Sequence, residues 1–86
     1  MPEYTITFAR SARRELERLD TRFVVRIFPA IESLAQEARP SGCRKLRGQE
    51  NLWRIRIGDY RVVYKIDDGA SVIDIVAVRH RREAYQ

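Results

Sequence analysis

The segment that decides the fold runs from Lys45 to Ile66 and reads KLRGQENLWRIRIGDYRVVYKI. Two runs of alternating apolar and polar residues flank its Gly58-Asp59 pair. Such a pair predicts a two-residue β-hairpin turn, because glycine adopts a positive φ without a Cβ clash. The register that follows pairs Ile57 with Tyr60, Arg56 with Arg61, Ile55 with Val62, Arg54 with Val63 and Trp53 with Tyr64.

The two faces of this predicted hairpin differ in chemistry. The apolar face requires a core and carries Trp53, Ile55, Ile57, Tyr60, Val62 and Tyr64. The other face carries Arg54, Arg56, Arg61 and Lys65. Directly opposed like charges destabilise a strand pair, so Arg56 opposite Arg61 indicates a functional surface that binds a polyanion. The alternative is a face kept charged for solubility, but such faces usually mix both signs.

Length and composition predict one domain over residues 1–86, with a single small core. The one cysteine, Cys43, excludes a disulfide within the chain and has no neighbouring metal-ligand pattern. No apolar run reaches the length of a membrane span, and no signal-peptide pattern opens the chain. We therefore expect a soluble, cytoplasmic protein without a membrane partner.

The positive charge is unevenly distributed along the chain. The net charge is +5, from 17 Lys and Arg against 12 Asp and Glu. Residues 1–43 hold 7 basic and 6 acidic groups, a balance of +1, and residues 44–86 hold 10 and 6, a balance of +4. The excess on the second half indicates nucleic acid or another acidic partner.

Two helices are predicted between the first strand and the hairpin. Residues 4–8 alternate as a strand does, and Ser11 is a candidate N-cap for a first helix. A second helix would be capped by Thr21 and reach about Glu37, with Pro29 kinking it or dividing it after Phe28. Its apolar positions at helical spacing are Phe23, Ile27, Ile31, Leu34 and Ala38.

A turn at 67–70 and a nearly all-apolar strand at 72–78 complete the pattern. The predicted fold class is α+β, with an N-terminal strand, an antiparallel helical hairpin and then three consecutive antiparallel strands, in the order βααβββ. The helices would cover one sheet face and leave a basic open face on the other.

Four segments of the chain, in this order, resemble the RelE/ParE superfamily of type II toxins, and specifically its RelE-like mRNA interferase branch. They are Lys45-Leu46-Arg47-Gly48, Trp53-Arg54-Ile55-Arg56-Ile57, Asp59-Tyr60-Arg61-Val62-Val63-Tyr64 and Val78-Arg79-His80-Arg81-Arg82-Glu83-Ala84-Tyr85. The resemblance implies a toxin that cleaves mRNA in the ribosomal A site, without a cofactor. It also implies a cognate antitoxin that holds the toxin inactive in a hetero-oligomer.

The resemblance also assigns candidate site residues. The family's catalytic positions fall on Arg54, Arg56, Arg61, Arg81 and Tyr85. Some members use a histidine near the C-terminus, and His80 lies close to that position, so it is a further catalytic candidate. We expect further RNA contacts from Lys45, Arg47, Lys65, Arg79 and Arg82. The strand pair that is often lysine in the family is arginine here, and no acid precedes the Lys-Leu-Arg-Gly motif. Arginine does not deprotonate usefully, so neither Arg54 nor Arg56 is a general base.

Cleavage by 2′-OH attack places negative charge on the non-bridging phosphate oxygens, which Arg56, Arg61 and Arg81 would stabilise with bidentate hydrogen bonds. His80 is either a general acid or base or a solvated histidine at a strand end. If the last strand continues, His80 and Arg81 point to opposite faces, so they share a site only if the chain turns there. Tyr85 would stack on a base or transfer a proton, unless it is a frayed terminal residue.

The sequence also bears on metal binding and on two alternative functions. The acid pairs Glu15/Glu17 and Asp67/Asp68 lack the oxygen cluster that Mg²⁺ or Ca²⁺ requires, so we expect no metal site. A ParE-like inhibitor of DNA gyrase is the alternative on the same scaffold, because fold alone does not separate it from a nuclease. A plain basic RNA-binding domain would explain the charge but not the ending from Arg81 to Tyr85.

Overall fold

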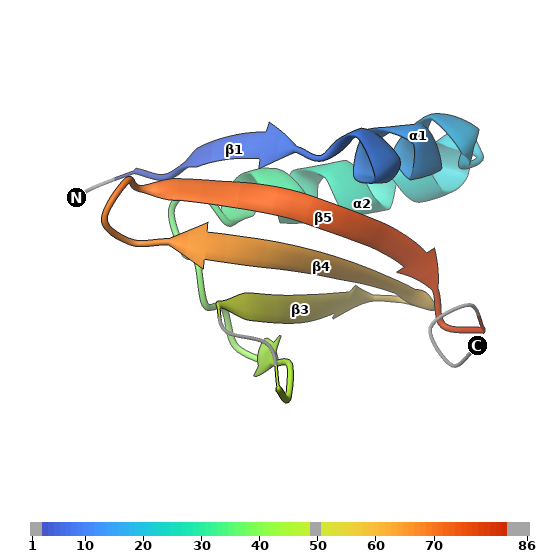
Figure 1. The fold of residues 1–86 in the computed structure, drawn as a ribbon. Helices are drawn as coiled ribbons and strands as arrows, with labels where there is room; N and C mark the ends of the chain where they lie inside the picture. Colours follow the sequence, from blue (N-terminus) through green and yellow to red (C-terminus); the bar gives the residue numbers. More distant parts are fainter. Residues whose placement is uncertain (1–2, 49–50, 83–86) are drawn as a thin grey trace.

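A computed structural model describes residues 3–48 and 51–82 (Figure 1). In chain order the elements are β1 (Thr5–Phe8), α1 (Arg10–Arg18), α2 (Thr21–Ser33), β2 (Arg44–Lys45), β3 (Leu52–Ile57), β4 (Tyr60–Asp67) and β5 (Val72–His80). The predicted α+β fold is confirmed, and the structure adds one short strand, β2, before the predicted hairpin. None of the helices in the described part is long and apolar enough to span a membrane.

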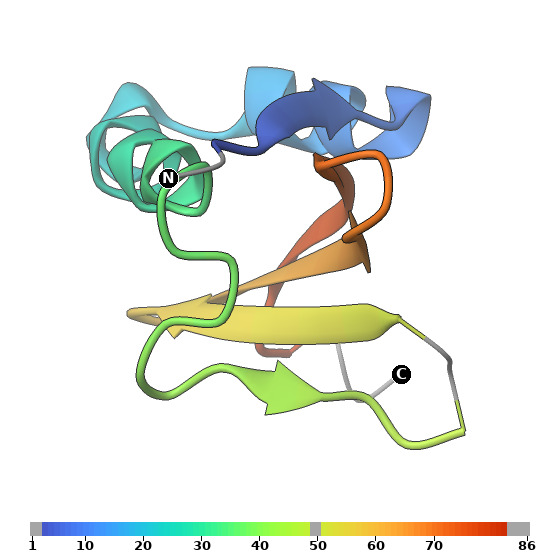
Figure 2. The same cartoon turned by 90° about the vertical axis from the view of Figure 1, so that its left-hand side faces the viewer.

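The strands form one mixed sheet in the order β1-β5-β4-β3-β2. β1 pairs parallel to β5, and all other neighbours are antiparallel. β5 is therefore an interior strand, between β1 and β4, as its apolar sequence predicts. Figure 2 shows how strongly the sheet twists, because the direction of the strands changes markedly between β5 and β3.

The central hairpin has the predicted register, with Ile57 opposite Tyr60 and Arg56 opposite Arg61. Gly58 has a φ of +60°, whereas Asp59 is not among the residues of positive φ. This combination is that of a type II′ turn, in which glycine takes the first central position. The two-residue turn fixes the register, and the register decides which side chains share a face.

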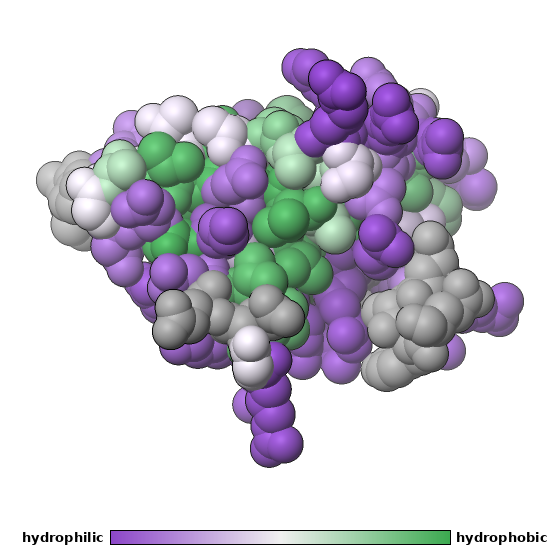
Figure 3. All heavy atoms as spheres, viewed as in Figure 1, coloured by the Kyte–Doolittle hydropathy of each residue, from purple (hydrophilic) through white to green (hydrophobic). Residues whose placement is uncertain are grey.

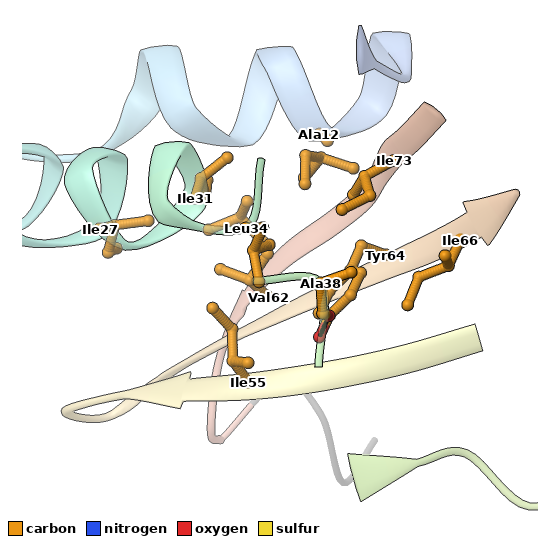
Figure 4. Packing of buried hydrophobic residues seen from close by; sticks show 12 residues of the cluster. Ala12, Ile27, Ile31, Leu34, Ala38, Ile55, Val62, Tyr64, Ile66 and Ile73 are labelled. Carbon is orange, nitrogen blue, oxygen red and sulfur yellow. Dashed lines mark hydrogen bonds between the residues drawn. The ribbon is translucent and has the colours of Figure 1, made fainter. Parts of the chain in front are cut away.

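The core lies between α2 and the sheet (Figure 4). Ile27 and Ile31 of α2 and Leu34, directly after it, reach toward Val62 and Tyr64 of β4, and all five side chains are at most 1% exposed. Apolar residues spaced one helical turn apart meet apolar residues spaced two apart on the strand, so the two periodicities build one core. The apolar face predicted for the hairpin is confirmed where it contacts α2.

The helix boundaries differ from the prediction at three points. α1 begins at Arg10 without a side-chain cap, so the predicted Ser11 cap is wrong. The N-cap of α2 is Asp20, whose carboxylate accepts a hydrogen bond from Arg22 N at 2.9 Å. α2 ends at Ser33 rather than near Glu37, and Ala38 is buried from the loop beyond it. The sequence offers two adjacent capping residues, Asp20 and Thr21, and it does not show which of them caps α2.

Pro29 does not divide α2, which runs unbroken from Thr21 to Ser33. The proline lies on the exposed side of the helix, as does Val25 four residues earlier. The Val25 carbonyl loses an N–H partner to the proline, and on an exposed face water can replace that partner. The predicted division after Phe28 is therefore wrong.

Candidate nucleic-acid interface on the open sheet face

Three arginines form a row across the sheet face opposite α2. Arg56 of β3 lies directly opposite Arg61 of β4, which lies directly opposite Arg79 of β5. Val62 and Val78 are buried on the α2 side, so the pleat directs the neighbouring arginines to the open face. Because adjacent strands are about 4.8 Å apart, the three side chains leave one face side by side. We call Arg56, Arg61 and Arg79 the arginine row.

A second line of residues crosses the same face two positions further from the turn. Arg44 of β2 lies opposite Arg54, and the line continues through Val63 and Ala77. Figure 3 accordingly shows hydrophobic residues in the middle of this face, with hydrophilic residues around them. The open face is therefore basic toward the β2–β3 edge and the Gly58 end, and apolar in its centre.

The other predicted RNA-binding residues in the segment from β2 to β4 are more scattered. Lys65 lies opposite Asp74 in the sheet, and the Asp74 carboxylate accepts a hydrogen bond from Thr7 Oγ1 at 2.7 Å. Lys45 lies opposite Trp53, on the core side of the sheet, and its side chain is exposed. Arg47 is exposed in the turn after β2. The structure does not gather these three residues around the arginine row.

The end of β5 separates His80 from the arginine row. His80 lies opposite Tyr60, and the two rings meet edge to face with centroids 5.2 Å apart. Tyr60 contacts Phe23 of α2, so His80 is on the core side of the sheet, whereas Arg79 is on the open side. The backbone N of Arg82 donates to His80 Nδ1 at 3.2 Å, so in the neutral ring the proton is on Nε2.

The strand ends at His80, and the chain then turns. Such a turn is the condition under which His80 and Arg81 could share a site. Arg81 N donates to Asp59 O at 2.7 Å, and Arg81 Nε is 3.9 Å from Asp59 Oδ1. Arg81 and Arg82 are both exposed beside the hairpin turn. Arg81 therefore lies at the same end of the sheet as the arginine row. Tyr85 lies outside the described residues.

Carboxylates accompany the arginines at the edges of the face. Glu15 of α1 forms an ion pair with Arg79 Nε, and Asp59 faces Arg81. Within residues 3–48 and 51–82, no group of three or more His, Cys, Asp or Glu is arranged to hold a metal ion. The chemistry that this face offers is hydrogen bonding and charge stabilisation of phosphate oxygens by guanidinium groups.

Two residues of this face are not predictable from the sequence. Arg44 joins it because β2 pairs with β3, but a strand of two residues has no period to detect. Glu15 reaches it from α1, where the sequence shows only an acid on a mixed-charge helix. The i, i+4 spacing of Ser11 and Glu15 is the one local signal, and it does not identify their partner strand.

The sequence profile that describes the ParE toxin of the type II toxin–antitoxin system, parDE, matches residues 6–85 of this chain. The chain belongs to the RelE/ParE superfamily of type II toxins. The toxin is 32% identical over 84 residues to Toxin RelG of Mycobacterium tuberculosis, covering 96% of this chain and 97% of the relative. It is 34% identical over 84 residues to Toxin RelE of the same organism, covering 95% and 81%.

Solved structures support the same assignment. The toxin resembles a chain of the RelBE2 toxin–antitoxin complex from M. tuberculosis, with a TM-score of 0.78 and 33% identity, covering 92% of this chain and 99% of the other. It also resembles a chain of the archaeal RelE-RelB complex from Pyrococcus horikoshii OT3, with a TM-score of 0.81 and 28% identity, covering 94% and 97%. The predicted membership of the superfamily is confirmed.

Proposed function

We propose that this toxin is a ribosome-dependent mRNA endoribonuclease that acts in the cytoplasm. The observation that carries the proposal is the arginine row, three adjacent guanidinium groups on an open sheet face of a chain with a net charge of +5. A row of like charges across three strands costs stability, and a bound polyanion relieves it. The similarity to Toxin RelG and Toxin RelE supports the same conclusion.

Cleavage would proceed by attack of the RNA 2′-OH on the adjacent phosphorus, without a metal ion in the chemical step. Arg56 and Arg61 would donate hydrogen bonds to the non-bridging oxygens as negative charge develops there, and Arg81 would contribute from the end of the sheet. Arg54 would bind the neighbouring phosphate. Removing one preorganised donor of this kind typically raises the barrier by about 3–4 kcal/mol.

Proton transfer would fall to His80 or Tyr85, because an arginine side chain remains protonated. His80 is on the core side of the sheet, and its Nε2 is the donor in the neutral ring. A role for His80 therefore requires the RNA to pass over the end of β5 rather than only across the open face. His80→Ala and Tyr85→Phe distinguish the two residues, since losing a general acid or base costs about 10²–10⁴ in rate.

We infer that a cognate antitoxin restrains this activity in a hetero-oligomer. Several similar solved structures are complexes of a toxin with RelB. An antitoxin segment that folds on binding and carries acidic residues would neutralise the basic face. Its affinity would then fall as salt concentration rises. An affinity that is constant from low to high salt would instead indicate a mainly apolar contact.

Inhibition of DNA gyrase is the second candidate, favoured by the match to the profile of the ParE toxin. The two functions share a scaffold and differ in the site. Mapping mRNA 5′ ends within minutes of inducing the toxin without an antitoxin separates them. We expect codon-phased cuts that disappear in Arg61→Ala and persist in Arg13→Ala, which removes an exposed arginine of α1. Intact messages together with stalled gyrase complexes would establish the second candidate.

The cleaved ends test the chemistry independently. Attack by the 2′-OH leaves a 2′,3′-cyclic phosphate on the upstream fragment, whereas hydrolysis by an activated water can leave a 3′-hydroxyl. Because ribosomes themselves require Mg²⁺, the product end is a better test than removal of metal. A 3′-hydroxyl on the upstream fragment would rule out the proposed mechanism.

A further inference from the structure

Glu15 contacts two neighbouring residues of β5 with one carboxylate. Its Oε1 accepts a hydrogen bond from Val78 N at 2.9 Å, and its Oε2 pairs with Arg79 Nε. The Glu15 side chain is 21% exposed, and it is less exposed than Glu17 on the same helix. Glu15 is thus the acid of α1 that faces the sheet.

The geometry of α1 explains why a hydrogen-bond acceptor lies at this position. β1 ends opposite Ile75, so β5 continues beyond its parallel partner. Along this free edge, Ser11 Oγ donates to Val76 O at 3.1 Å and Glu15 accepts from Val78 N. One helical turn rises about 5.4 Å and two strand residues span about 6.6 Å, so side chains at i and i+4 can replace a missing strand.

The ion pair also determines how Arg79 is presented. A guanidinium has five N–H donors, and the Glu15 carboxylate engages the one at Nε. The Nη1 and Nη2 groups carry the other four N–H donors, and the Arg79 side chain is 46% exposed. Without the carboxylate, repulsion from Arg61 directly opposite would favour rotamers that carry Arg79 out of the arginine row.

We propose that Glu15 is a positioning residue that holds Arg79 in the arginine row, so that its Nη groups donate to an RNA phosphate. The inference rests on the proposed function in one respect, because it requires RNA to bind the open face. It adds a residue of α1 to a site otherwise built from strands. It also gives an acidic residue the task of strengthening the binding of a polyanion.

The test uses this expectation, because removing an acidic side chain would ordinarily strengthen the binding of RNA, whereas removing the Glu15 carboxylate should weaken it. Glu15→Gln and Glu17→Gln each raise the net charge by one, and glutamine at position 15 keeps an acceptor for Val78 N. Binding of a single-stranded RNA oligonucleotide is measured over a series of salt concentrations. We expect Glu15→Gln to raise Kd about three- to tenfold, in line with one weakened charge-assisted hydrogen bond, and to reduce the salt slope by about one. Glu17→Gln should leave Kd unchanged or lower it.

The Arg79→Ala background distinguishes positioning from a general effect on the fold. If Glu15 acts through Arg79, adding Glu15→Gln to Arg79→Ala changes neither Kd nor the salt slope further. Equal weakening in both backgrounds would make Glu15 a structural residue and overturn the inference. So would a Glu15→Gln variant that binds RNA as Glu17→Gln does.

The same measurements separate this inference from the proposed function. If the wild-type toxin binds RNA but never cleaves it, and Glu15→Gln binds RNA more weakly as expected, the nuclease proposal is wrong and the positioning role stands. If the wild type makes codon-phased cuts but Glu15→Gln binds RNA with the same Kd as Glu17→Gln, the nuclease proposal stands and the positioning role is wrong. Absence of RNA binding by the wild type would overturn both.

Discussion

Arg61 has a like charge on each side, Arg56 in β3 and Arg79 in β5. Cross-strand pairs contribute up to about 1 kcal/mol, and like charges make that contribution unfavourable. At the residue scale, this repeated placement of like charge agrees with the ligand-binding role that we propose for the open face.

Arg61→Ala should leave the melting temperature unchanged or slightly raised, because Arg61 lies on the open face of the sheet with a like charge on each side. Surface substitutions usually stay within about 0.5 kcal/mol, which for a domain of this size is a few degrees at most. Thermal unfolding followed by circular dichroism measures it, with Arg13→Ala as the charge-matched control. A large drop for Arg61→Ala alone would make the residue structural.

Tyr64 is a residue that serves the fold. It is fully buried, and its hydroxyl donates to Ala38 O at 2.9 Å. Burial raises the pKa of the Tyr64 phenol well above its ordinary value of about 10, and the nearby Cys43 thiol raises it further. The folded state therefore retains a proton that the unfolded chain releases at lower pH.

Stability should consequently fall as pH rises above about 10, because between the two pKa values the folded state binds more protons than the unfolded state. Tyr64→Phe should flatten this alkaline decline. At neutral pH the variant should lose about 1–2 kcal/mol, since the buried Ala38 carbonyl loses its donor. Unfolding in urea at pH 7 to 11 measures both effects. Parallel alkaline curves for the two proteins would contradict the assignment.

At the scale of elements, the hairpin of β3 and β4 depends on its turn. Gly58 has a φ of +60°, and a Cβ built there would lie 3.6 Å from Arg26 Nη2. There is room for a methyl group, so the obstacle to a side chain is the backbone conformation. Gly69, in the turn between β4 and β5, has a Cβ position 3.5 Å from Asp67 Oδ1 and is not among the residues of positive φ.

Gly58→Ala should therefore lower the free energy of unfolding by about 1–2 kcal/mol, the cost of a non-glycine residue in the left-handed region. Gly69→Ala is the matched control and should have little effect or be slightly stabilising. Urea denaturation of both variants gives the comparison. Equal losses would mean that turn conformation is not what distinguishes the two glycines.

At the scale of the whole molecule, one cluster links segments that are distant in sequence. Tyr4 Oη donates to Asp68 Oδ1, and Arg39 Nη2 pairs with Asp68 Oδ2 at 3.0 Å. The Arg39 guanidinium also lies over the Trp53 ring, 4.9 Å from its centroid. The cluster joins the start of the chain, the loop after α2, β3 and the β4–β5 turn at the end of the sheet remote from the arginine row.

The hydrogen bond from Arg39, with that from Tyr4, lowers the pKa of the Asp68 carboxyl below its ordinary value of about 4. The contribution of Asp68 to stability is thus present above pH 4 and is lost as pH falls through the lowered pKa. Asp68→Asn should lose less stability on acidification than the wild type. Melting temperatures between pH 6 and pH 2 test this, with exposed Glu37→Gln as control. An acid profile identical to the wild type would exclude Asp68 as a contributor.

The central hairpin, its register and the shared face of Arg54, Arg56 and Arg61 were all predictable from the sequence. The reason is that a two-residue turn and the strand pleat are local rules that act over a few residues. The same rules identified the helical residues that face the core. They were less informative at helix ends, where neighbouring residues compete for the cap, and at Pro29, whose effect depends on exposure.

Three features depend on how distant segments pair: Arg79 completes the arginine row, Arg44 joins the open face, and His80 lies on the opposite face. Which strands pair is a property of residues far apart in the chain, and a register shift between Val63 and Tyr64 sets the alignment with β5. A shift of one residue exchanges the two faces of a strand, so periodicity within β5 could not settle its alignment. The contact of Glu15 with Arg79 also depends on distant segments, because β1 ends before β5 does and leaves an edge of β5 that α1 covers.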